Sequence, residues 1–175
     1  MHRKSILGLV AVMIIGGAAI YFYLGGLNEV EVNVESVSDY NLVGFHFQGE
    51  GDSDTLRKGW QQAKEYIESG RLNGTVTVLH YKDTTLEDGQ VKVFMGVRLE
   101  QGTSDLPGNY TRLTIPARRT IRANISAHNM VMPNSETIEE RLLKKAEESR
   151  LELQNFTIEQ YLNEKELWVD MPVRQ

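Results

Sequence analysis

The sequence predicts an α+β fold in which a strand–helix–strand–strand (βαββ) unit occurs twice behind an apolar N-terminal helix. Three observations support this fold class. Residues 6–27 carry no charged side chain. Apolar residues recur with helical spacing in two later stretches, around 56–67 and 136–151. Segments in which apolar and polar residues alternate, as they do in half-buried strands, flank both stretches.

The composition supports one globular domain and argues against several functions. The chain has 175 residues, 41% of them hydrophobic, which is enough for a substantial core. It has no cysteine, so disulfides, thiolate metal sites and cysteine nucleophiles are excluded. The formal net charge is -5 and every acidic residue lies beyond residue 28. This charge disfavours nucleic-acid binding and favours neutral or cationic ligands.

The apolar run Ile6–Leu27 has the length that a helix needs to cross the hydrocarbon core of a membrane. Arg3 and Lys4 precede it and Glu29 follows it. Because positive charges favour the cytoplasmic side, we expect a single-pass protein of the inner membrane, with its N-terminus in the cytoplasm and its C-terminal domain periplasmic or extracellular. A cleaved signal peptide is the alternative, but the run is long for one and no Ala-x-Ala site ends it. The predicted parts are a cytoplasmic N-terminus at 1–5, a transmembrane helix at 6–27 and a domain at 28–175.

The first βαββ unit is predicted at about 30–100. Ser53 or Asp54 is a suitable N-cap for its helix, and Gly70 is placed to end that helix. Trp60 belongs to the apolar stripe of the helix. The strands are expected at 29–35, 41–48, 75–81 and 90–99, with a hairpin loop between the last two.

The second unit is predicted at about 108–174. It comprises an extended segment, 110–126, bent at Pro116, then a helix at 136–151 capped by Asn134 or Ser135, and a closing hairpin. Two similar units packed side by side predict one antiparallel sheet with both helices on one face. The other face would then be free to form a concave ligand groove between the halves.

The closing hairpin, Phe156–Val173, places an acid in what otherwise resembles buried sheet. Alternation puts Glu159 and Tyr161 on one face of its first strand. Trp168 and Asp170 share one face of its second strand, and we expect Trp168 beside Glu159. Such a face is either a solvated surface or an aromatic-walled pocket that holds one buried charge.

Five local patterns occur in a set order: Val43-Gly44 before the helix with Trp60, His80-Tyr81-Lys82-Asp83, Ile115-Pro116-Ala117, Glu159-Gln160-Tyr161 and Met171-Pro172-Val173. In this order they resemble the GyrI-like, or effector-binding, domain family over about 30–174. That family occurs in gyrase-inhibitory proteins and as the ligand-sensing domain of AraC- and MerR-type regulators. The resemblance implies that Glu159 lies in a central pocket and pairs with lipophilic cations, on which aromatic residues stack.

The chain departs from this family in two places. The segment 128–134, HNMVMPN, stands where the family often has an Arg-Gly-Pro-Tyr-like turn. The apolar run stands where regulators carry a helix-turn-helix, so a transcriptional role does not carry over. Gyrase inhibition is likewise unexpected if the domain lies outside the cytoplasm.

The predicted ligand-binding residues are Glu159, Tyr161, Trp60, Tyr81, Phe94, Tyr110 and Trp168. The carboxylate would balance the charge of a cation, and each aromatic face would add about 0.5–2 kcal/mol of cation–π attraction. The plainer alternative for Glu159 is a solvated strand residue. For the aromatic residues the alternative is packing in a helix core or a sheet.

No catalytic residue, metal site or cofactor is predicted. His46, His80 and His128 lie far apart without an HExxH motif, and no Gly-x-Ser-x-Gly elbow occurs. The expected function is that of a bacterial, membrane-anchored module that binds an amphipathic or cationic small-molecule effector. Two alternatives stay open: a small hydrolase that uses Glu159 as general base with Tyr161 or Tyr81 as hydrogen-bond donor, and a regulator that contacts a protein partner and has no ligand.

Overall fold

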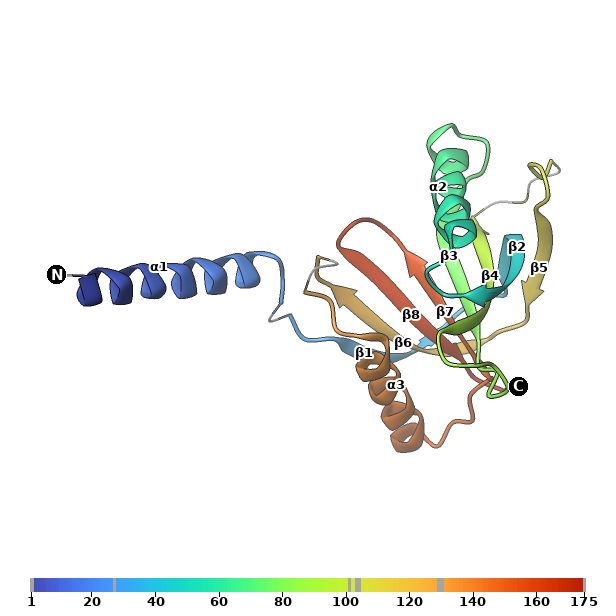
Figure 1. The fold of residues 1–175 in the computed structure, drawn as a ribbon. Helices are drawn as coiled ribbons and strands as arrows, with labels where there is room; N and C mark the ends of the chain where they lie inside the picture. The colour runs from blue at the N-terminus through green and yellow to red at the C-terminus, as the bar shows by residue number, and fades with distance from the viewer. Residues whose placement is uncertain (1, 27, 101, 103–104, 129–130, 175) are drawn as a thin grey trace.

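The computed structural model describes residues 2–26, 28–100, 102, 105–128 and 131–174, with side chains from residue 13 onward. Figure 1 shows an N-terminal helix that leads away from a curved sheet and two further helices. In chain order the elements are α1 His2–Tyr23, β1 Glu31–Ser36, β2 Tyr40–Glu50, α2 Asp54–Glu68, β3 Gly74–Tyr81, β4 Gln90–Leu99, β5 Thr111–Ile115, β6 Arg119–Ser126, α3 Ser135–Ser149, β7 Phe156–Tyr161 and β8 Glu166–Pro172. The predicted α+β class is confirmed.

All the strands form one eight-stranded sheet in the order β1-β6-β8-β7-β3-β4-β2-β5. Every pairing in it is antiparallel. Two sets of three strands lie at its centre, β6-β8-β7 and β3-β4-β2, and each set comes from one βαββ unit. The outer strands are exchanged, because β1 pairs with β6 of the second unit and β5 pairs with β2 of the first. The exchange ties the two units into one sheet.

Local chemistry sets the helix ends as expected. The side chain of Ser53 accepts a hydrogen bond from the backbone N–H of Leu56 at the start of α2. Asn134 does the same for Thr137 at the start of α3. The helix α3 ends at Arg150, which adopts a left-handed conformation with φ 52°.

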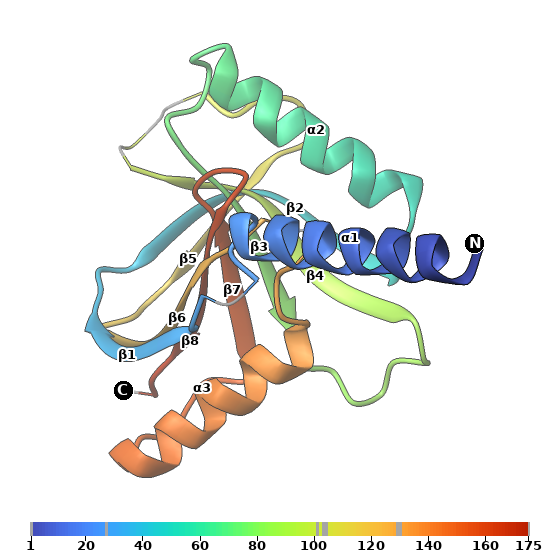
Figure 2. The ribbon, with the colours of Figure 1, turned by 90° about the vertical axis from the view of Figure 1, so that its left-hand side faces the viewer.

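Both helices cover the same face of the sheet. In the strand register, Glu159 of β7 lies between Val78 of β3 and Val169 of β8, so these three side chains share a face. Val78 belongs to the core cluster that includes Trp60 of α2, and Val169 belongs to the cluster built around α3. Figure 2 shows α2 and α3 on either side of β7. The predicted arrangement of the helices is confirmed, and Glu159 lies between them.

The opposite face curls onto itself and holds a second core. Its buried cluster consists of Tyr40, Leu42, Leu79, Phe94, Ile115, Ala117 and Ile158. The hydroxyl of Tyr40 on β2 lies 2.8 Å from a carboxylate oxygen of Asp170 on β8, although β7, β3 and β4 separate these strands in the sheet. The prediction that this face is a free, concave ligand groove is therefore wrong, since packed side chains occupy its centre.

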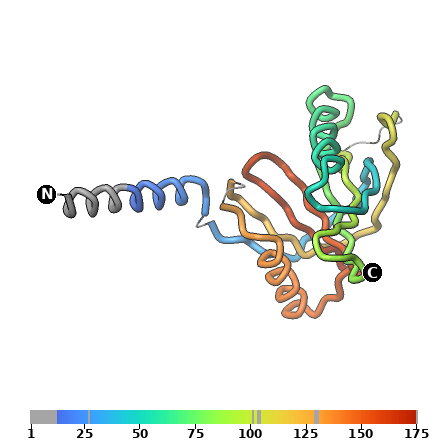
Figure 3. The backbone as a smooth tube through the Cα atoms, viewed as in Figure 1, coloured from blue at the N-terminus to red at the C-terminus, as the bar shows by residue number. Residues whose placement is uncertain are grey.

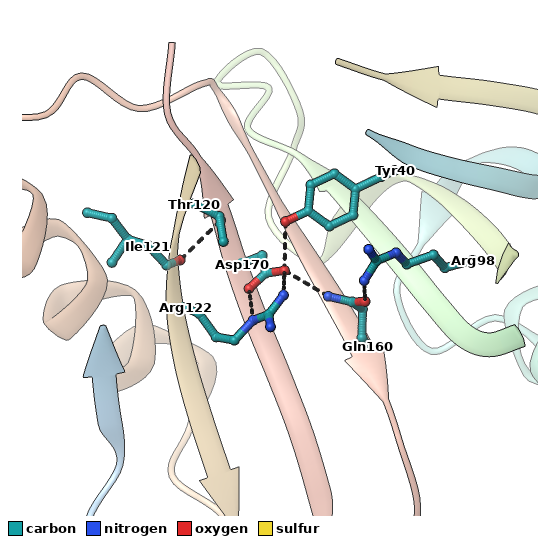
Figure 4. A network of polar contacts seen from close by, with 7 residues as sticks. All are labelled: Tyr40, Arg98, Thr120, Ile121, Arg122, Gln160 and Asp170. Carbon is teal, nitrogen blue, oxygen red and sulfur yellow. Dashed lines mark hydrogen bonds and ion pairs between the residues drawn. The ribbon is translucent and has the colours of Figure 1, made fainter. Parts of the chain in front are cut away.

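Asp170 is the centre of a polar network within this second core (Figure 4). The side chain is fully buried. Arg122 donates two hydrogen bonds to it, at 2.7 and 2.8 Å, and Tyr40 and Gln160 donate one each at 2.8 Å. Arg98 on β4 in turn donates to Gln160 on β7. The network therefore joins strands from both units.

The helix α1 leads away from the sheet, as the smooth trace in Figure 3 shows for its described part. At its end, the backbone carbonyl of Leu24 accepts a hydrogen bond from the N–H of His128, and the Asn28 side chain donates to the carbonyl of Ser126. Its large apolar side chains are exposed at Met13, Ile14, Ile15, Ile20 and Phe22. Among the residues that the structure describes, no helix combines the length and apolarity required for a membrane crossing. The membrane anchor at 6–27 stays a prediction from the sequence.

Candidate functional site

Glu159 occupies the middle of β7, on the face that α2 and α3 flank. Only 18% of its side chain is exposed. A carboxylate in such a place loses most of its hydration, so it needs hydrogen bonds or a positive charge nearby. The acid is thus not the solvated strand residue that the plainer alternative describes.

Two side chains from the same face contact this carboxylate. Tyr161, two residues further along β7, donates its hydroxyl to Oε2 of Glu159 at 2.5 Å. Nε2 of His80, on the neighbouring strand β3, lies 3.4 Å from the same oxygen. This nitrogen is buried, and none of the described residues forms a hydrogen bond with it. His80 was not among the predicted site residues, because the sequence does not reveal that β3 pairs with β7.

Electrostatics keeps the carboxylate of Glu159 ionised at neutral pH. Burial raises its pKa, but the neighbouring His80 and the hydroxyl of Tyr161 together lower it by more, so its pKa lies below the usual value for a glutamic acid. Burial also raises the pKa of Tyr161, and the charge of Glu159 and the hydrogen bond between them raise it further. The phenol therefore stays protonated as the donor of that bond.

Trp60 of α2 forms the aromatic wall of the site. Its ring meets the ring of Tyr161 edge to face, with centroids 4.4 Å apart. A hollow of about 550 Å³ lies beside this pair, lined by Trp60, Lys64, Ile67, Val76, Tyr161 and Glu164 among others. Glu159 lines a much smaller hollow of about 40 Å³ under α3. Tyr161 connects the two, because it lines the first and its hydroxyl donates a hydrogen bond to Glu159, which lines the second.

Three of the other predicted ligand-binding residues lie on the opposite face of the sheet. Trp168 pairs with Gln160, not Glu159, and its ring packs against the guanidinium of Arg122 at 4.1 Å. The prediction of Trp168 beside Glu159 is wrong because the β7–β8 register places Val169 there. Phe94 is buried in the second core, and Tyr81 packs against that same cluster.

Tyr110 lies on the helix-covered face but belongs to the packing under α2. Its ring meets the ring of Tyr66 at a centroid distance of 5.4 Å. Burial raises the pKa of Tyr110 to about 12. Its hydroxyl is buried, and no described residue forms a hydrogen bond with it. Of the seven residues that the sequence suggested, the structure brings together Glu159, Tyr161 and Trp60.

A larger hollow, about 800 Å³, lies at another place. It is lined by Tyr81, Lys82, Lys92, Pro116, Phe156 and Arg174 among others, and it is wide open to solvent. Glu159 does not line it. Within the described residues, no group of three or more histidine or acidic side chains could hold a metal ion.

The protein is thus a single sheet built from two βαββ units that exchange their outer strands, with the largely buried carboxylate of Glu159 between its helices. Solved proteins share this fold. The structure of SAV2435 bound to tetraphenylphosphonium matches with a TM-score of 0.54 and 13% identity, over 82% of this chain and 94% of that one. EcmrR, in a cryo-EM structure of its complex with DNA, matches with a TM-score of 0.63 and 14% identity, over 99% of this chain and 70% of that one. A hydrolase encoded by lin2189 from Listeria innocua matches with a TM-score of 0.56 and 8% identity, over 82% of this chain and 92% of that one.

At these identities the likeness shows a common fold. No family model matches the sequence, and no curated protein matches it significantly.

Proposed function

We propose that this chain binds an amphipathic, positively charged small molecule between α2 and α3, with Glu159 as the counter-charge and Tyr161 and Trp60 as the aromatic walls. One observation carries the proposal. An ionised carboxylate is largely buried, and its contacts are a neutral phenol and an imidazole, neither of which is a permanent cation. Such a charge is costly to bury alone and is balanced when a cation binds.

The size and chemistry of the adjoining hollow fit a small-molecule ligand. Its volume of about 550 Å³ lies within the range of roughly 300–1,000 Å³ typical of small-molecule sites. The face of an aromatic ring at its wall would attract a cation by about 0.5–2 kcal/mol. Tyr161 would have to turn away from Glu159 for the ligand to reach the carboxylate. The structure of SAV2435 with tetraphenylphosphonium suggests a first probe, a lipophilic cation with aromatic substituents.

Glu159→Gln is expected to weaken tetraphenylphosphonium binding at least tenfold, about 1.4 kcal/mol, because the amide keeps the shape but removes the charge. The measurement is isothermal titration calorimetry on the full chain in nanodiscs of neutral lipid, with empty nanodiscs as the blank. Glu87→Gln is the matched control: it removes the same charge from an exposed position that does not line the hollow. It is expected to change the affinity by less than about threefold, because exposed charges are screened. Equal affinities for wild type and Glu159→Gln would contradict the assigned role.

The proposed anchor would place this site near ligands that partition into lipid. We propose that residues 6–27 cross the inner membrane and that the domain faces the periplasm or the exterior. The absence of cysteine makes the topology directly testable. A membrane-impermeant maleimide is expected to label Asp52→Cys in intact cells with a permeabilised outer membrane, and to label Ser5→Cys only after lysis. The reverse pattern, or recovery of the protein in the soluble fraction, would refute the proposed topology.

Hydrolysis is the second candidate, because Glu159, His80 and Tyr161 form a cluster able to exchange protons. The lowered pKa of Glu159 argues against it as the base, since a general base works best with a pKa near the working pH. Turnover of an electrophilic substrate that is lost in Glu159→Gln would favour the hydrolase over the binding module.

A further inference from the structure

We infer that His80 is a built-in competitor of the cationic ligand, so that its protonation state sets the affinity of the Glu159 site. The inference rests on the proposed function. When His80 is protonated, it neutralises Glu159 from inside the protein; when it is neutral, the carboxylate is left for an external cation. Ligand binding should then release a proton and strengthen as the pH rises.

The geometry of His80 carries this inference. Its Nε2 lies 3.4 Å from Oε2 of Glu159, within ion-pair range. The same nitrogen is buried and has no hydrogen bond from any described residue, which is uncommon for a buried polar atom. The rest of the imidazole is accessible, with 39% of the side chain exposed. A proton can therefore reach the ring from solvent while its inner nitrogen faces the carboxylate.

The position of His80 follows from the sheet register. His80 pairs with Thr157 on β7 and with Val93 on β4. Strand alternation places its side chain on the same face as Val78, which itself pairs with Glu159. The imidazole is thus diagonal to the acid on the neighbouring strand, a separation that side chains of this length can bridge.

The other charged groups around the site do not take over this role. From β7, Tyr161 contributes a phenol that stays neutral. From α3, Glu139 lines the small hollow with Glu159, but its carboxylate pairs with Lys82 at 2.5 Å. Lys64, Glu68, His128 and Glu164 line the larger hollow, which Glu159 does not line. Among the described residues, His80 is the basic side chain in ion-pair contact with Glu159.

The physical consequence is a competition between two cations for one buried carboxylate. Histidine is the side chain whose charge ordinarily changes between pH 5 and 8. With His80 protonated, a cationic ligand must displace the imidazolium or share the acid with it, and like charges repel. With His80 neutral, that repulsion is absent and the imidazole no longer compensates the charge of Glu159. For one linked proton, affinity rises by at most about tenfold per pH unit through the transition.

The test is calorimetry with tetraphenylphosphonium from pH 5.5 to 8, on the full chain in neutral nanodiscs and in buffers of different ionisation heat. We expect the affinity of the wild type to rise at least about fivefold over this range, with release of a proton when the ligand binds. His80→Gln is expected to bind with a nearly constant affinity, and to bind more tightly than wild type at pH 5.5. His46→Gln, on the opposite face beside Phe94, is the control and should keep the pH dependence. The inference is overturned if wild type and His80→Gln share the same pH dependence.

A ligand-free measurement separates this inference from the proposed function. The imidazole resonances of His80 can be followed by NMR during a pH titration in wild type and in Glu159→Gln. Charge coupling predicts that the two titration curves differ. If they differ and tetraphenylphosphonium does not bind at any pH, the proposed ligand class fails while the internal pair stands. Coincident curves would overturn the inference whatever the ligand does.

Discussion

Replacing Asp170 with asparagine is expected to lower the free energy of unfolding by about 3–5 kcal/mol, because it leaves a buried guanidinium without its counter-charge. Asp170 is fully buried, and only 11% of the Arg122 side chain is exposed. The carboxylate accepts four hydrogen bonds, from Arg122, Tyr40 and Gln160. An amide can accept some of these but cannot balance the charge.

Unfolding by guanidinium chloride, followed by circular dichroism, measures this loss of stability. Asp54→Asn is the control, since Asp54 forms an ion pair with Arg57 at 2.9 Å on the surface, where the two side chains are 75% and 66% exposed. That change is expected to cost less than about 1 kcal/mol. The double variant with Arg122→Met should lose less than the sum of the two single variants, because neither buried charge is then left alone. An Asp170→Asn protein as stable as the control would show that the network does not hold the second core together.

Gly96→Ala is expected to destabilise the protein by about 3 kcal/mol or more, at the upper end of the cost of inserting a methyl group into a packed region. Gly96 of β4 pairs directly with Gly44 of β2. A Cβ at Gly96 would lie 2.0 Å from the carbonyl oxygen of Val43 and 2.5 Å from the Cα of Gly44. Both obstacles are backbone atoms, so relief would require the strands to move apart.

Thermal unfolding is a suitable measurement, and a loss of this size corresponds to a fall in Tm of roughly 6–12 °C for a chain of this length. Gly102→Ala is the matched control, because a Cβ there meets no atom within 4 Å. We expect its Tm to stay within about 2 °C of wild type. If Gly96→Ala and Gly102→Ala melt together, the close approach of β2 and β4 is not a requirement of the fold.

The two predictions concern the same feature, the curvature of the sheet. Gly44 and Gly96 allow the backbones of β2 and β4 to approach closely, and Tyr40 of β2 reaches Asp170 across three intervening strands. On the face away from the helices, buried side chains fill the centre. The face between α2 and α3 is then the one that keeps a hollow beside Glu159.

Local chemistry made much of the secondary structure predictable. Ser53 and Asn134 cap their helices as expected, and Pro116 falls in the break between β5 and β6. Each of these residues acts on its own segment of backbone, so the physical cause lies within a few residues of sequence. The same holds for alternation along β7, which correctly placed Glu159 and Tyr161 on one face.

Which side chains surround Glu159 depends on pairings between strands that are far apart in the sequence, and the sequence patterns did not reveal those pairings. Alternation along one strand tells which of its residues share a face. It does not tell which residues of the neighbouring strand lie beside them on that face. A shift of one residue in register exchanges the two faces. The prediction therefore placed Trp168 beside Glu159, whereas the register places Val169 there, and it did not find His80.

By itself, the sequence determined the order of the helices and strands, the two βαββ units and an acid in the closing hairpin, because caps, turns and periodicity are local properties. Only the tertiary structure decided that β1 and β5 change places between the units, that Asp170 is sealed in a second core and that Glu159 meets His80. These outcomes depend on how strands far apart in the chain pair and curve, which no short segment encodes.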